Sequence, residues 1–292
     1  MKTAKSIIAF AAAAAISAAA FASPPKTAEI WDGVKMAGKT TEPIDYSKSK
    51  FVPPCVSVKS ATLDFYLLES EKPVSVVIVC PGGAYRWLSV IDEGEKIAKR
   101  LNENGFSAVV LKYRVPENYD GALMDAQRAI RLLRAKAKEW NINPDKIAIM
   151  GFSAGASLAA RASTNFAAQT YEPLDETDRL SARPDATCLI YPAYCSQAEK
   201  NRRFSKGRAK DGDSYDKRYE IADWNVVTKD TPPAFITQTQ FDPYVDAAIA
   251  YYLALKEAKV PAQLHLLPKG QHGYKDEKVF EMYFDWLKSE GF

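Results

Sequence analysis

The sequence predicts an α/β fold with a mostly parallel central sheet and helices on both of its faces. Apolar, β-branched runs alternate along the chain with segments whose apolar residues recur at helical spacing. The run Val74–Cys80 is nearly continuous in its apolar character, as in a strand that is buried on both faces. Right-handed crossovers between such strands bring their carboxyl ends to one edge of the sheet. Functional residues are therefore expected in the loops along that edge.

The order of the predicted elements follows from these patterns. The segments 56–58 and 62–68 alternate as half-exposed antiparallel strands do at the edge of a sheet. Further strands are expected at 74–80, 107–112, 146–150, 187–191, 234–239 and 262–267. Helices are expected at 92–104, 119–140, 156–165, 245–258 and 279–288. The charged segment 196–219 is either a solvated excursion or a flexible flap at the rim of a site.

A G-x-S-x-G motif, residues 151–155, stands between a predicted strand and a helix of small residues. Its glycines allow the backbone to turn sharply, so that Ser153 is presented at the top of the sheet. The serine hydroxyl would then lie at the positive end of the helix, where N–H groups favour developing negative charge. Because both flanks are present, we interpret the motif as a nucleophile elbow rather than an ordinary glycine-rich turn.

A second loop at the same edge follows the strand 74–80 and begins with a proline and two glycines. Backbone N–H groups without bulky side chains can approach a tetrahedral oxygen closely. Beside a nucleophile elbow, this loop and the residue after the serine usually supply such donors. We therefore expect an oxyanion hole formed by the N–H groups of Gly83, Ala84 and Ala154.

The chain contains only two histidines, so the search for a general base is short. His265 alternates with leucines inside a strand and is expected to be structural. His272 lies among small residues after the last strand, from where an imidazole can reach Ser153. Asp242, at the end of the preceding strand, can accept the other imidazole N–H and fix its tautomer. Asp246, about one helical turn later, is the rival for this role.

Length and composition predict a single exported domain. The chain has 292 residues, of which 47% are hydrophobic, and shows no second compositional regime. Residues 1–22 combine a basic start, an apolar core and an Ala-Phe-Ala site, which indicates a secretory signal peptide rather than a membrane anchor. We expect an irregular arm at 23–50, a main domain at 51–292, and a secreted or periplasmic protein without membrane attachment after cleavage.

Charge and cysteine content exclude some other functions. Without Lys2 and Lys5 the net charge is close to neutral, so nucleic acid is not an expected partner. Two histidines in these surroundings do not make a zinc site, and no metal is expected. Cys80 and Cys188 lie in apolar runs and are interpreted as small core residues. A Cys188–Cys195 bridge is the alternative.

Seven short motifs occur along the chain: Pro81–Tyr85, Glu93–Gly94, Tyr113–Arg114, Asp125–Ala129, Gly151–Gly155, Thr231–Pro233 and Gly270–Gly273. As a set they resemble α/β-hydrolase esterases of the acetylxylan esterase and xylanase-associated, feruloyl esterase-like type. The resemblance extends from about residue 74 to the end of the sequence. It implies an esterase that needs no cofactor and removes acetyl or feruloyl groups from plant polysaccharides such as xylan. Ser153, Asp242 and His272 fall on the catalytic triad positions of that family.

Two other functions remain open beside this one. A serine peptidase of the same fold would use the same acyl chemistry, although 292 residues leave little room for the extra domain that such enzymes usually carry. A catalytically idle, carbohydrate-binding homologue is also considered, because Phe241 stands where related esterases often have another acid.

Tyr85 and Trp87, just after the oxyanion loop, either line the pocket for an acylated carbohydrate or small ester, or pack within the fold.

Overall fold

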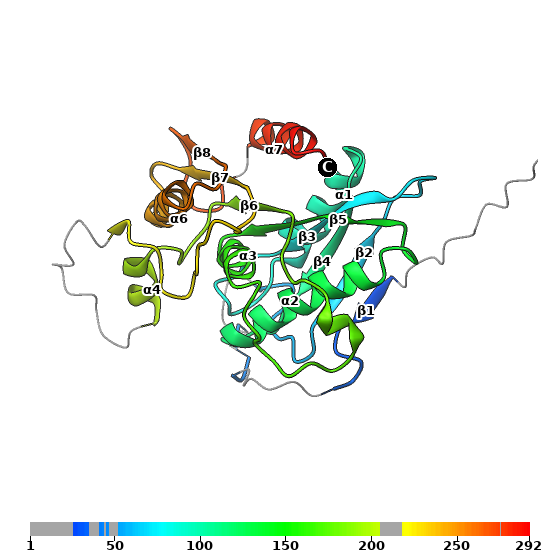
Figure 1. Cartoon of the computed structure of the whole chain (residues 1–292). Helices are drawn as coiled ribbons and strands as arrows, with labels where there is room; N and C mark the ends of the chain where they lie inside the picture. The colour runs from blue at the N-terminus through cyan, green and yellow to red at the C-terminus, as the bar shows by residue number, and fades with distance from the viewer. Residues whose placement is uncertain (1–25, 35–40, 44, 47–51, 205–217, 275) are drawn as a thin grey trace, which may run out of the picture.

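An eight-stranded sheet forms the centre of the computed structural model, which describes residues 26–34, 41–43, 45–46, 52–204, 218–274 and 276–292 (Figure 1). The strands lie side by side in the order β1-β2-β4-β3-β5-β6-β7-β8. Their bounds are β1 Thr27–Glu29, β2 Thr62–Tyr66, β3 Val74–Cys80, β4 Ser107–Lys112, β5 Ile142–Phe152, β6 Ala186–Ile190, β7 Ala234–Thr239 and β8 Ala262–Leu267. Strand β2 is antiparallel to β1 and β4, and the other pairs are parallel. The predicted α/β fold with a mostly parallel sheet is confirmed.

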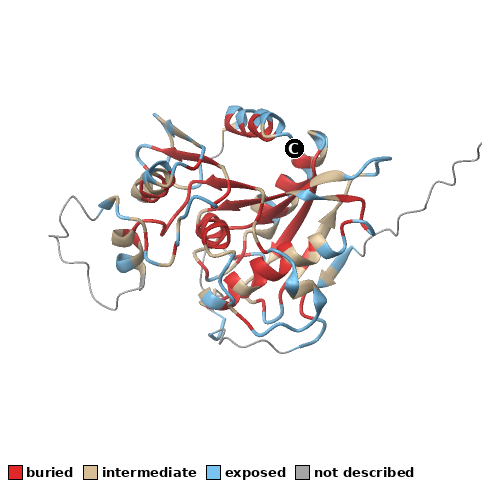
Figure 2. Cartoon of the chain, viewed as in Figure 1, coloured by how far each residue is buried: buried red, intermediate tan, exposed pale blue. Residues whose placement is uncertain are grey.

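Helices cover both faces of this sheet, as Figure 1 shows. The bounds of the helices that pack on the sheet are α1 Lys96–Glu103, α2 Tyr119–Ala135, α3 Ala154–Thr164, α6 Val245–Glu257 and α7 Glu277–Ser289. Helices α2, α3 and α6 share one apolar cluster, and α1 and α7 share a second cluster across the sheet. In Figure 2 the central strands and the inner sides of the helices are buried, while the outer sides of the helices and parts of the edge strands β1 and β8 are exposed. In the described ranges, no helix has both the length and the apolar character needed to cross a bilayer.

Some element boundaries differ from the sequence prediction. The expected helix at 92–104 is divided, because its first part, η1 (Val90–Glu95), is a π-helix that leads into α1. Helix α2 ends at Ala135, although the apolar spacing continues to residue 140. The spacing continues because Trp140 packs against Phe65 from a turn outside the helix, with the ring centroids 4.8 Å apart. Helical spacing in a sequence therefore reports burial, but it does not fix where a helix ends.

The first described segment differs from the irregular arm that the sequence predicts at 23–50. Thr27–Glu29 forms the edge strand β1, and Ile30 and Trp31 are each only 1% exposed. A strand of three residues is too short to give a recognisable alternation, so the sequence pattern missed it. The predicted signal peptide at 1–22 lies outside the described residues, as do positions 35–40, 44 and 47–51 of the arm.

The charged segment 196–219 is not a solvated excursion throughout. Its first part forms α4 (Gln197–Phe204), on which Glu199 is 1% exposed. The Glu199 carboxylate accepts hydrogen bonds from the N–H groups of Tyr194 at 3.0 Å and Ala247 at 2.9 Å. Burial raises the pKa of Glu199 well above its usual range. Composition concealed this contact, because one of the two backbone donors to the acid, Ala247, lies far along the chain. Residues 205–217 lie outside the described residues.

The four cysteines all lie in the described part of the chain and are free thiols. Cys80 and Cys188 are fully buried in β3 and β6, in agreement with their interpretation as core residues. Burial raises the pKa of both thiols, which keeps them protonated and unreactive. The alternative bridge between Cys188 and Cys195 is not formed.

A buried ionic network fastens the first strand to the rest of the fold. Asp125, on α2, is fully buried and accepts a hydrogen bond from Nε1 of Trp31 at 2.7 Å. The same carboxylate accepts from the backbone N–H of Arg114 at 2.8 Å and from its Nε at 2.9 Å. Burial raises the pKa of Asp125, and the Arg114 cation opposes this effect. The carboxylate is thus held in the core by the Trp31 indole and by the backbone and guanidinium of Arg114.

We expect Asp125→Ala to lower the free energy of unfolding by about 3–5 kcal/mol, because it leaves the Arg114 cation buried without its partner. The measurement is equilibrium urea unfolding followed by circular dichroism. Asp120→Ala is the matched control on the same helix, since the Asp120 side chain is 87% exposed. Its effect should stay below about 1 kcal/mol. Equal losses in the two variants would contradict the stabilising role of the network.

Candidate active site

Ser153 lies in a strained turn between β5 and α3. Its φ of 52° and ψ of −117° are rarely adopted by residues other than glycine. A Cβ added to Gly155 would overlap the carbonyl oxygen of Cys80, and one added to Gly151 would overlap that of Gly155. The two glycines therefore allow α3 to start directly against the end of β3. This is the strand, turn and helix geometry that the G-x-S-x-G motif predicts.

A serine, an imidazole and a carboxylate are hydrogen-bonded in series at this turn. Ser153 Oγ lies 2.7 Å from Nε2 of His272, and Nδ1 of His272 lies 2.8 Å from Oδ2 of Asp242. Asp242 is 3% exposed, and its Oδ1 accepts from the N–H of Tyr244 at 2.8 Å. The structure thus brings together the three residues that the sequence analysis selects, and it favours Asp242 over Asp246 as the partner of the imidazole.

Two tyrosine rings enclose the imidazole of His272. The ring centroids of Tyr191 and Tyr244 lie 5.5 Å and 4.8 Å from that of His272, both edge to face. The His272 side chain keeps 28% of its surface exposed, so it remains accessible from one side. Neither tyrosine is recognisable from the sequence alone, because neither belongs to a catalytic motif. His265 lies on β8 against the ring of Phe235, and burial lowers its pKa, as expected for a structural residue.

The loop after β3 lies beside Ser153. A Cβ added to Gly82 would be 3.1 Å from Cβ of Ser153. Gly83, Ala84 and Tyr85 all have positive φ angles, of 133°, 56° and 57°. These positive φ angles turn the chain sharply after β3, next to the turn that carries Ser153.

The hydrogen bonds of this loop leave the predicted oxyanion donors available. The carbonyl oxygen of Gly83 accepts from the N–H groups of Arg86 and Trp87, and that of Ala84 accepts from Nη2 of Arg203. Within the part of the chain that is described, the N–H groups of Gly83 and Ala84 donate no hydrogen bond. Ala154 is the first residue of α3, where an N–H group has no acceptor inside the helix. All three expected donors therefore lie on the two turns that meet at Ser153.

Tyr85 and Trp87 differ in their exposure. Tyr85 is fully buried, with ring centroids 5.9 Å from Tyr113 and 5.0 Å from Tyr119. Tyr85 therefore packs within the fold, and the assignment of this residue to the substrate pocket is not supported. Trp87 is half-buried and keeps surface that a substrate could touch. Arg203, from the charged segment 196–219, reaches the same loop from α4.

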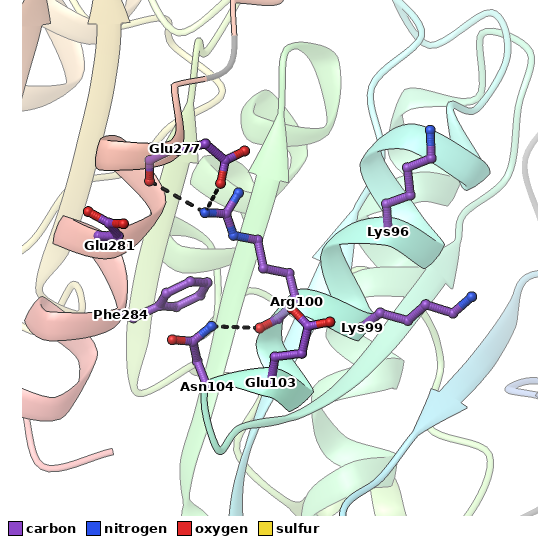
Figure 3. A pocket seen from close by; sticks show the side chains of 8 residues that line it. All are labelled: Lys96, Lys99, Arg100, Glu103, Asn104, Glu277, Glu281 and Phe284. Atoms are coloured by element: carbon purple, nitrogen blue, oxygen red, sulfur yellow. Dashed lines mark hydrogen bonds and ion pairs between the residues drawn. The ribbon is translucent and has the colours of Figure 1, made fainter.

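A groove of about 520 Å³ lies between α1 and α7, away from this site (Figure 3). Lys96, Lys99, Arg100 and Glu277 are among its lining residues, and Ser153 is not. Its cations are paired: Lys96 with Asp92, Lys99 with Glu95, and Arg100 with Glu277. Among the described residues, no group of three or more His, Cys, Asp or Glu side chains is arranged to hold a metal ion.

The fold and the hydrogen-bonded series at the elbow define the class of α/β hydrolases. In agreement, a family model described as the alpha/beta hydrolase fold matches residues 77–276. The chain belongs to this family.

Three relatives extend the comparison. An acetylxylan esterase from Xylanibacter ruminicola is 31% identical over 236 residues, which cover 75% of this chain and 46% of that protein. An endo-1,4-beta-xylanase B from Butyrivibrio fibrisolvens is 30% identical over 225 residues, or 71% of this chain and 34% of that protein. The crystal structure of an acetyl ester-xyloside bifunctional hydrolase from Caldicellulosiruptor lactoaceticus superposes with a TM-score of 0.71 at 30% identity, covering 92% and 98% of the two chains. The resemblance to acetylxylan esterases is confirmed, although the chain spans less than half the length of the first two relatives.

The site geometry predicts a strong hydrogen bond between the Nδ1–H of His272 and Asp242, which should give a far-downfield proton resonance in the NMR spectrum of the resting protein. Asp242→Asn should abolish this resonance, because an amide at that position cannot hold the same tautomer. Asp246→Asn is the matched control and should retain it. The opposite pattern would identify Asp246 as the partner of His272.

Proposed function

We propose that this protein is a serine carboxylesterase that removes acetyl groups from xylan or a related acylated polysaccharide. The observation that carries the proposal is the uninterrupted series from Ser153 Oγ through His272 to the buried carboxylate of Asp242. Such a series activates a hydroxyl for attack on an acyl carbon and needs no cofactor. The esterase names of relatives with 30–31% identity support the same reaction class.

The proposed mechanism has two acyl-transfer steps. In the first, Ser153 Oγ attacks the ester carbonyl while Nε2 of His272 takes its proton, and the protonated imidazole then delivers that proton to the leaving sugar oxygen. In the second, His272 deprotonates a water molecule that attacks the acyl-enzyme, and Ser153 leaves with the proton returned. Asp242 keeps Nδ1–H oriented and stabilises the imidazolium in both steps.

The negative charge that develops on the carbonyl oxygen needs donors beside Ser153. We assign this role to the N–H groups of Gly83, Ala84 and Ala154, which lie on the two turns that meet at the serine. Donors that are already oriented do not have to reorganise during the reaction, and each contributes about 3 kcal/mol to transition-state stability. The exposed side of His272 and the half-buried Trp87 leave room for the sugar portion of the substrate.

The names of the relatives guide the choice of substrate. Acetylxylan esterase, xylanase B and acetyl ester-xyloside hydrolase all refer to xylan or xylosides, and two of them refer to an acetyl ester. We therefore place acetylated xylan first among the candidate substrates. A feruloyl ester is the second candidate, since it requires the same chemistry and a larger acyl pocket.

The wild-type protein should hydrolyse 4-nitrophenyl acetate and release acetate from acetylated xylan. Ser153→Ala and Asp242→Asn should each lower kcat by about 10⁴-fold or more, because they remove the nucleophile and the group that orients its base. Asp246→Asn is the matched control and should stay within about threefold of wild type. Parallel assays on methyl ferulate rank the acetyl and feruloyl groups.

Two results would contradict the proposal. If wild type is no faster than Ser153→Ala on any of these esters, the protein is not an ester hydrolase of this kind. If Asp242→Asn keeps wild-type kcat while Asp246→Asn loses it, the reaction stands but the assigned acid is wrong.

We further propose that the protein acts outside the cytoplasm. The basic start, apolar core and Ala-Phe-Ala site of residues 1–22 support export, and a polysaccharide substrate would be met there. Expression of the full chain in a bacterium should yield a periplasmic or secreted protein whose first residue, by N-terminal sequencing, is Ser23. Replacing both Ala20 and Ala22 by leucine should block cleavage, because the site requires small residues. An uncleaved wild-type chain in the cytoplasm would contradict export.

A further inference from the structure

Glu93 forms two short hydrogen bonds beneath the proposed active site, and the proposed mechanism does not use it. Its Oε2 accepts from the backbone N–H of Gly82 at 2.7 Å, and its Oε1 accepts from the hydroxyl of Tyr191 at 2.8 Å. The two donors belong to different parts of the site, since Gly82 opens the oxyanion loop and Tyr191 packs on His272. One carboxylate therefore connects the loop to the residue that supports the base.

The bond to Gly82 fixes where the oxyanion loop lies. At the Gly82 Cβ position, Glu93 Oε2 and the carbonyl oxygen of Phe152 would each be 2.8 Å away, so the Gly82 peptide is held tightly between the acid and the elbow. The next two peptides carry the N–H groups of Gly83 and Ala84. Because donors must lie within a few tenths of an ångström of the developing oxyanion, a displaced Gly82 peptide would misalign both of them.

The bond to Tyr191 fixes one side of the imidazole. Tyr191 has a positive φ of 38°, which a residue other than glycine adopts only when its surroundings hold it there. Burial and the nearby Glu93 carboxylate raise the pKa of Tyr191 well above its ordinary value, so the hydroxyl stays protonated and donates. The Tyr191 ring, whose centroid lies 5.5 Å from that of His272, then restricts the movement of the imidazole.

The local backbone around Glu93 is also unusual. Glu93 lies in the π-helix η1, and insertions of this kind occur frequently at functional sites. Gly94, which follows, brings η1 against β4, since a Cβ there would be 3.0 Å from Cγ1 of Val110. The chain thus uses a rare helix and a close contact to place this one carboxylate under the loop.

We propose that Glu93 is a positioning residue that aligns the oxyanion loop and the general base at the same time. The inference rests on the proposed esterase function. A carboxylate suits this role because its two oxygens can each accept a separate, charge-assisted hydrogen bond. Glu93 does not contact the reacting atoms, so it acts on the transition state through Gly82 and Tyr191.

The test compares Glu93→Ala, Glu93→Gln and Tyr191→Phe with the wild-type protein, after the concentration of reactive serine has been titrated with a fluorophosphonate. Glu93→Ala should lower kcat on 4-nitrophenyl acetate by about 10- to 100-fold with little change in KM, because misaligned donors weaken only transition-state binding. Glu93→Gln should recover most of this loss, since its amide can still accept from Gly82 and donate to Tyr191. Tyr191→Phe should cost less than Glu93→Ala.

A trifluoromethyl ketone provides a second readout, because its adduct with a serine carries an oxyanion. Its affinity should fall in Glu93→Ala by the same factor as kcat/KM. Asp92→Asn is the matched control, since Asp92 is the neighbouring acid, its side chain is 61% exposed, and it pairs with Lys96 outside the site. It should leave both quantities unchanged.

Several outcomes would overturn the proposal. It fails if Glu93→Ala keeps the wild-type kcat per titrated serine, if only KM changes, or if Glu93→Gln is as impaired as Glu93→Ala. Should Glu93→Ala not fold, Tyr191→Phe carries the test, because it removes one of the two donors to Glu93. A lower kcat per titrated serine in Tyr191→Phe then supports the positioning role, and a wild-type kcat overturns it. If wild type hydrolyses no ester, the proposed esterase function fails, whatever the role of Glu93. The positioning role fails as well if wild type and Glu93→Ala are then labelled by the fluorophosphonate at equal rates.

Discussion

The close approach of α3 to the end of β3 is the constraint on which the rest of the site depends. Gly155 has no room for a side chain because the Cys80 carbonyl occupies that space, and this contact sets the distance between the serine turn and the glycine loop. Ser153 is held at a strained φ of 52° as a result. The strain is maintained by a helix that is buried along its whole length, so packing energy supports a conformation that the local sequence alone would not adopt.

Two buried acids, Asp125 and Glu199, and the half-buried Glu93 perform different tasks in three regions of the fold. Asp125 fastens the first strand to α2, Glu199 fastens α4 to the start of α6, and Glu93 connects the glycine loop to Tyr191. In each case the donors come from segments far apart in the sequence. A carboxylate that is taken out of water needs such donors, and it therefore fixes the relative positions of the segments that supply them.

The sequence predicts those features that short, local patterns encode. Four strands, including β3 and β7, begin and end where the apolar runs predict, and the candidate serine, acid and histidine are predicted from a motif and from positions after β5, β7 and β8. The strand β1, the burial of Glu199 and the role of Tyr191 could not be found in this way. Each depends on a partner that lies far away in the sequence, and neither residue type nor spacing reports such a partner. The Glu93–Gly94 motif was visible, but only the fold shows which groups the acid contacts.

His272 lies in a segment that is expected to be less stable locally than the segment that carries Ser153. This residue follows β8, which among the described strands pairs only with β7 and has two exposed side chains. Segments of this kind open by local fluctuation at a lower free energy than the centre of a sheet. Ser153, by contrast, is attached to the central strand β5. The proposed nucleophile and base thus belong to parts of the molecule with different local stability. Separating them requires only the free energy of local opening at the edge of the sheet, which is lower than the free energy of global unfolding.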